Sequence, residues 1–99
     1  MVALYKEPAN RAEFDKYYWE THLLLAGKIP GLLKSEVCTF YELEGGGELP
    51  YYLMTKLYFN SKEEMAAAFA TPEGRATAKD LRNFTTPSSV TITYAEVKE

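Results

Sequence analysis

The sequence is poor in cysteine and contains no long apolar segment. Its one cysteine, Cys38, leaves no partner for an internal disulfide. Because no histidine or asparagine lies beside it in sequence, we interpret this thiol as a small core residue rather than a nucleophile. The leucine run Leu23–Ala26 is far too short to cross a bilayer core of roughly 30 Å. The opening MVALYKEPAN turns polar before a secretory signal could form, so we expect a cytoplasmic protein.

Clusters of basic side chains are also missing. The chain has 11 Lys and Arg against 14 Asp and Glu, for a net charge of −3. Nucleic acids and acidic membranes are normally bound by concentrated positive charge. We therefore predict that neither is a partner.

Histidine occurs once, at His22. The sequence has no His/Cys cluster and no Glu-x-x-His pair, and Glu20 stands two positions before His22, which is the wrong spacing for one helical face. We therefore expect no metal and no other bound cofactor. A haem or metal protein with His22 as the ligand is the least favoured hypothesis.

Aromatic residues, in contrast, are abundant. The 99 residues include eight Tyr, five Phe and one Trp, more aromatic area than one small core readily covers. Self-association would cover the excess. We predict a homodimer.

The hydrophobic pattern and the turn residues predict a single domain over residues 1–99 with the order βαββαβ. Strands are expected at 2–6, 32–43, 51–59 and 90–97, helices at 11–29, 61–69 and 71 to about 83, and a hairpin loop at 44–50. This is the ferredoxin-like α+β arrangement, a four-stranded antiparallel sheet with the helices on one face. The second and third strands carry bulky side chains on both faces, so two such sheets are expected to pack face to face in a dimeric α+β barrel.

The helix expected at 11–29 organises the fold. Asn10 is its predicted N-cap, and Pro30 and Gly31 end it. At about 100° per residue, one face collects the following side chains: Phe14, Tyr18, Trp19, His22, Leu25, Ala26 and Ile29. His22 therefore points toward the core.

A buried imidazole needs a partner for its ring nitrogens. Tyr18, one turn earlier, is in reach, whereas Asp15 lies roughly 10 Å away along the helix and cannot orient the ring directly. Two readings of His22 stay open. It is either a hydrogen-bonded core residue or a residue of a ligand pocket.

The spacing of Phe14, Tyr17-Tyr18, His22, Leu25 and the segment Pro30-Gly31-Leu32 resembles the EthD family of small dimeric α+β barrel proteins. The resemblance covers essentially the whole chain and includes the opening VALYK, FDKYYWETH, IPGL, YYL, and Thr71-Pro72-Glu73-Gly74 leading to Asn83-Phe84. One departure is Leu24, where the family often has proline. The resemblance implies a homodimer with one pocket per subunit between helix and sheet, and a part in the breakdown of small organic molecules such as ethyl tert-butyl ether.

Two functions are favoured over the metal hypothesis. The first is a cofactor-independent enzyme, of the monooxygenase or isomerase type, acting on a small apolar molecule with His22 as general acid/base and Tyr18 or Tyr17 as hydrogen-bond donor. Phe14, Trp19 and Leu25 are the expected ligand contacts. The second is a non-catalytic protein that binds a hydrophobic metabolite and delivers it to a separate oxygenase.

Overall fold

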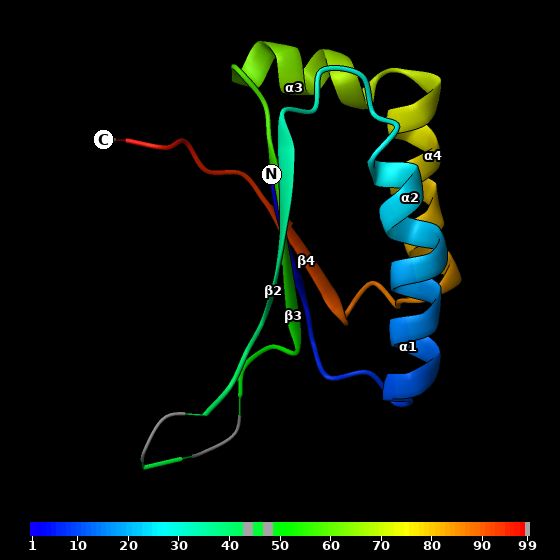
Figure 1. Ribbon diagram of the computed structural model, residues 1–99, viewed down its shortest axis with the longest axis vertical. Helices are drawn as coiled ribbons and strands as arrows, with labels where there is room; N and C mark the ends of the chain where they lie inside the picture. The colour runs from blue at the N-terminus through cyan, green and yellow to red at the C-terminus, as the bar shows by residue number, and fades with distance from the viewer. Residues whose placement is uncertain (43–44, 47–48, 99) are drawn as a thin grey trace.

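In the computed structural model, which describes residues 1–42, 45–46 and 49–98, four strands form one antiparallel sheet (Figure 1). They lie in the order β2-β3-β1-β4, and their bounds are Val2–Tyr5 for β1, Lys34–Thr39 for β2, Leu53–Tyr58 for β3 and Val90–Thr93 for β4. The predicted α+β fold with ferredoxin-like strand order is confirmed.

The helical layer lies on one side of this sheet (Figure 1). Its segments are α1 (Arg11–Tyr17), the π turn η1 (Tyr18–His22), α2 (Leu23–Ala26), α3 (Lys62–Phe69), α4 (Pro72–Asp80) and the 3₁₀ turn η2 (Leu81–Asn83). The first three form one continuous helical rod beside α4, and α3 crosses one end of the sheet. The opposite face of the sheet carries no helix among the described residues.

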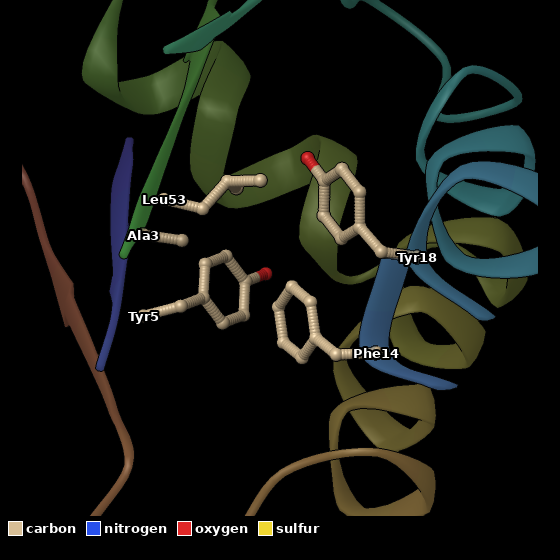
Figure 2. Close-up of a cluster of buried hydrophobic side chains, with 5 residues drawn as sticks. All are labelled: Ala3, Tyr5, Phe14, Tyr18 and Leu53. Carbon is tan, nitrogen blue, oxygen red and sulfur yellow. The ribbon is translucent and has the colours of Figure 1, made fainter. Parts of the chain in front are cut away.

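Strand alternation places the core between the two layers. Leu53, Thr55 and Leu57 of β3 are buried, while the intervening Met54 and Lys56 are only half-buried on the other face. On β1, Ala3 and Tyr5 are buried. These inward side chains meet Phe14 and Tyr18 from the helix, in the cluster of Figure 2 (Ala3, Tyr5, Phe14, Tyr18 and Leu53).

The three predicted helix starts are confirmed by their caps. The side chains of Asn10, Ser61 and Thr71 accept hydrogen bonds from the backbone N–H three residues later. The last of these donors belongs to Gly74, where any Cβ would collide with the backbone carbonyl of Ala68. Glycine at this position therefore lets α4 pack directly against the end of α3.

The predicted uninterrupted helix at 11–29 is wrong in two respects. The chain makes a π turn at η1, and α2 ends at Ala26. In an α-helix, side chains four residues apart point in directions that differ by roughly 40° around the helix axis. The wider π turn cancels part of that difference. As a result, residues at intervals of four, Phe14, Tyr18, His22 and Ala26, are all buried. Trp19, expected on the inward face, is 48% exposed because it lies at the edge of this narrower stripe.

The strands are also shorter than predicted, because a strand extends only as far as its partner. Thr93 pairs with Val2, the first residue of β1, so β4 ends there instead of continuing to residue 97. Thr39 pairs with Leu53 at the other end of the sheet, and β2 stops at that pair. Residue 43 of the predicted second strand and residues 44, 47 and 48 of the predicted hairpin loop lie outside the described residues.

Candidate functional site

A cavity of about 280 Å³ lies between the sheet and the helical layer. Its walls are mainly apolar, with Ala3 and Leu57 from the sheet and Leu23, Ala26 and Leu81 from the helices. The polar side chains that line it are Tyr5, Tyr18, His22, Thr55, Thr77 and Tyr94. An apolar cavity with a few convergent polar groups is the usual form of a small-molecule site.

His22 borders this cavity with one nitrogen anchored. Its ring is 6% exposed, and Nδ1 lies 2.9 Å from Oδ2 of Asp80. Nε2 has no hydrogen-bond partner among the described residues, yet no fully buried side-chain nitrogen or oxygen there lacks one. Nε2 therefore keeps accessible surface, on a residue that lines the cavity.

Asp80, at the last turn of α4, fixes the imidazole. It is 7% exposed and accepts three hydrogen bonds, from Tyr17 Oη at 2.6 Å, Asn83 Nδ2 at 2.9 Å and His22 Nδ1. Burial by itself would raise the pKa of the Asp80 carboxyl, but the bonds from Tyr17, Asn83 and His22 outweigh it and hold the pKa below its ordinary value. Asp80 is thus an ionised acceptor at neutral pH.

The same contacts determine the protonation of His22. Burial lowers the pKa of the imidazole below 6.5, and the hydrogen bond and negative charge of Asp80 offset only part of this effect. Because an ionised carboxylate only accepts hydrogen bonds, the proton of the neutral ring belongs on Nδ1. Nε2 then presents a lone pair to the cavity.

Phe84 packs between the imidazole and the aromatic core cluster. Its centroid lies 4.8 Å from that of His22 and 5.3 Å from that of Tyr17. It therefore packs against two of the groups joined through Asp80, and shields their hydrogen bonds from water.

Tyr18 does not hydrogen-bond to His22 in the way the sequence suggested. Its hydroxyl pairs with Thr55 Oγ1 on β3, and the rings of Tyr18 and His22 stand 5.9 Å apart between centroids. Burial raises the pKa of Tyr18 and, more strongly, of Tyr5. Both phenols therefore stay protonated near neutral pH and keep a proton to donate.

The structure separates the other residues proposed from the sequence. Tyr17 lies behind His22, where it holds Asp80, and does not line the cavity. Phe14 is part of the core beneath it, and neither Trp19 nor Leu25 lines it. Leu23 does, because the π turn moves it from the far side of the helix to the flank facing the cavity.

Asp80, Thr55 and Asn83 were not predicted as site residues from the sequence. A signal for Asp80 was present in α4, where Gly74, Thr77 and Asp80 recur every three residues and are all buried. A helix whose inward face carries small and polar side chains, rather than large apolar ones, buries polar groups that need hydrogen-bond partners.

A second depression, of about 440 Å³, lies between residues 30–33 and α3. It is larger but open, and among the described residues that line it Glu64 alone has a titratable side chain. We place the candidate site in the smaller, deeper cavity, because the convergent polar groups are there. Over the described part of the chain there is no group of three or more His, Cys, Asp or Glu that could hold a metal ion. The helices of that part include none long and apolar enough to span a membrane.

Residues 6–88, more than half of the chain, match the EthD domain. The chain belongs to the EthD family. This confirms the family resemblance of the motifs along the chain. The EthD chain is also 36% identical over 96 residues to an uncharacterised 11.0 kDa protein from the thcB-thcC intergenic region of Rhodococcus erythropolis, covering 97% of the chain and 91% of that relative.

Solved structures agree with this assignment. An ethyl tert-butyl ether d (ethd) family protein from Bacillus halodurans is 34% identical to the EthD chain with a TM-score of 0.90, covering 98% of the chain and 95% of that structure. HapK from Hahella chejuensis (9% identity, TM-score 0.60, 99% and 96% covered) shares the fold. So does SnoaB, a cofactor-independent oxygenase from Streptomyces nogalater (18% identity, TM-score 0.56, 99% and 94% covered). At these lower identities the likeness shows the fold alone.

Proposed function

We propose that this EthD protein binds a small, uncharged, largely apolar organic molecule in the cavity between helices and sheet, and that His22 acts on it as a general acid/base without a cofactor. The observation that carries the proposal is that the two ring nitrogens of His22 have different surroundings. Nδ1 is held by buried Asp80, while Nε2 is left to the cavity. A purely structural histidine would be expected to engage both nitrogens.

The size and charge of the cavity indicate the class of ligand. Its volume of about 280 Å³ is roughly twice that of an engineered apolar cavity that holds benzene. No Lys or Arg of the described residues lines it. A carboxylate or phosphate would meet no cationic side chain there, so an uncharged molecule of about ten non-hydrogen atoms is favoured. Ethyl tert-butyl ether, after which the family of the Bacillus relative is named, is smaller than this and belongs to the same class.

The first test of the proposal blocks the mouth of the cavity. Ala78 is exposed on α4 and lines the cavity, so Ala78→Trp should fill the entrance while leaving the core intact. Ala76 is exposed on the same helix but does not line the cavity, which makes Ala76→Trp the matched control. With the bicyclic hydrocarbon indane as the probe, we expect calorimetry to show binding weakened at least about tenfold by Ala78→Trp and unchanged by the control.

Two results would count against the ligand site. Equal binding of indane by both tryptophan variants would show that indane binds outside this cavity. No binding of indane to the unmodified protein would remove the proposal altogether.

We also propose that the protein is a homodimer formed by the helix-free face of the sheet. Leu4, Met54 and Cys38 lie in register across β1, β3 and β2 on that face and are only half-buried. An apolar row of this kind on an uncovered sheet is stabilised by packing against a second sheet. The Glu36–Lys56 ion pair, 3.3 Å between side-chain atoms, flanks the row and would help to set the register.

Sedimentation equilibrium at micromolar concentration tests the homodimer. We expect a dimer for the unmodified protein and monomer for Met54→Lys, because the new ammonium group would be buried without a partner. Ala66→Lys, on the exposed face of α3, serves as the control and should remain dimeric. A monomeric unmodified protein would contradict the proposal.

A further inference from the structure

We infer that the cavity is built to enolise an uncharged carbonyl compound, with Nε2 of His22 removing the proton from the carbon next to the carbonyl and the Tyr18–Thr55 hydroxyl pair binding the carbonyl oxygen. The inference rests on the proposed function, since it requires the ligand to lie in this cavity. It adds the reaction type and the functional group on which the site acts.

His22 has the tautomer that a base needs before any ligand binds. The Nδ1 hydrogen bond to Asp80 at 2.9 Å sets the neutral tautomer with its lone pair on Nε2. When Nε2 accepts a proton, the ring becomes a cation beside a carboxylate that is itself held by Tyr17 and Asn83. The charge formed in the reaction therefore meets a fixed, buried countercharge.

The donor is the hydroxyl pair on the sheet side of the cavity. Tyr18 and Thr55 carry two hydroxyl protons, and the bond between them uses one. Because Tyr18 is fully buried and Thr55 is 5% exposed, the proton that can go to a ligand oxygen is that of Thr55, with Tyr18 donating to Thr55. Figure 2 shows Tyr18 reaching from the helix toward the sheet and Tyr5 reaching from β1 toward the helix, so a second phenol points into the same space.

Other reaction classes lack their groups among the residues that line the cavity. Covalent catalysis needs a nucleophile next to the base, but the Thr77 hydroxyl donates to the Glu73 carbonyl at 2.9 Å and Thr55 is paired with Tyr18. Cys38 lies on the opposite face of the sheet, in register with Met54. A neutral base facing hydroxyl donors across an apolar space is the arrangement that proton transfer next to a carbonyl requires.

The step balances without a co-reactant. Nε2 takes the proton of the C–H bond, and the electron pair of that bond becomes the carbon–carbon double bond of the enolate. The carbonyl π pair moves to oxygen, where a hydroxyl of the pair stabilises it. In heavy water the proton on Nε2 exchanges with a solvent deuteron, and return of that deuteron from His22 to carbon restores the ketone with deuterium in place of hydrogen.

The experiment follows that exchange in 1-indanone, with indane as the matched compound that lacks the carbonyl. Proton NMR in heavy water gives the exchange rate, and calorimetry gives the binding of both compounds. We expect the unmodified protein to exchange the α-hydrogens at least about tenfold faster than buffer, and His22→Asn to return the rate to that of buffer. Tyr18→Phe should slow the exchange about tenfold, because Thr55 loses the hydroxyl that donates to it, while indane binding is unchanged.

The possible outcomes separate the inference from the proposed function. If 1-indanone binds but exchanges equally fast with the unmodified protein and both variants, enolisation is ruled out while the ligand site stands. If indane binds and 1-indanone does not, the carbonyl is not the group recognised, and the inference is overturned. If neither compound binds, the proposed function has failed. Should His22→Asn not fold, as judged by circular dichroism, the Tyr18→Phe rate decides.

Discussion

Replacing Asp80 with asparagine is expected to slow the α-hydrogen exchange of 1-indanone nearly to the rate in buffer while its binding stays nearly unchanged. An amide at this position can donate to Nδ1 of His22, and it still has an oxygen for Tyr17 or Asn83. The ring proton then moves to Nε2, so the nitrogen that faces the cavity loses its lone pair. The exchange rate and the tautomer of the imidazole are both measured by NMR.

Asp15→Asn is the matched control for this change. Asp15 is also a carboxylate of the helical layer that accepts from a tyrosine, with Tyr52 Oη at 2.8 Å and 3.0 Å from its two oxygens, but it has no contact with His22. It should leave the exchange rate as it is. A similar loss in both variants, or none in Asp80→Asn, would contradict the role given to Asp80.

Phe14→Ala is expected to lower the free energy of unfolding by about 3–5 kcal/mol, as measured by urea titration. Phe14 is buried, and its ring centroid lies within 6 Å of those of four other aromatic residues: Tyr5 at 5.5 Å, Tyr18 at 5.9 Å, Tyr52 at 5.6 Å and Phe84 at 5.4 Å. Removing it leaves a cavity at the centre of the cluster in Figure 2.

Trp19→Ala provides the comparison for this core substitution. Trp19 belongs to the same helical rod but is 48% exposed, so its loss should cost less than about 1 kcal/mol. If Phe14→Ala left stability nearly unchanged and abolished binding of indane, Phe14 would be a ligand contact, as the sequence suggested, and not a core residue.

The features that could be predicted from the sequence are those set by short-range rules. Alternation along β3 separates Leu53, Thr55 and Leu57 from Met54 and Lys56, because side chains in a strand point to opposite faces. The caps at Asn10, Ser61 and Thr71 depend on residues only three positions apart. Such local signals fixed the order of the elements, and that order permits few folds.

The candidate site could not be predicted in the same way, because its main contact is long-range. His22 and Asp80 are 58 residues apart, and nothing in a helical wheel of residues 11–29 indicates which side chain of another helix will meet the imidazole. A helical wheel assumes 3.6 residues in every turn, so it also could not predict the π turn at η1. It moved Leu23 to the cavity and left Trp19 at the surface.

The protonation of His22 also links the site to stability. Because burial lowers its pKa in the folded protein below the ordinary 6.5, the unfolded chain takes up this proton first. The stabilising contribution of the neutral imidazole is therefore present above pH 6.5, and it declines as the pH falls below that value.

His22 is the only histidine in the chain, so nitrogen NMR of ¹⁵N-labelled protein observes it without ambiguity. We predict a neutral ring at pH 7 with its proton on Nδ1, a pKa below 6.5, and a shift of the Nε2 resonance on addition of 1-indanone. A proton on Nε2 at pH 7, a pKa above 6.5, or an Nε2 resonance indifferent to saturating 1-indanone would contradict the claim that this nitrogen is the base of the cavity.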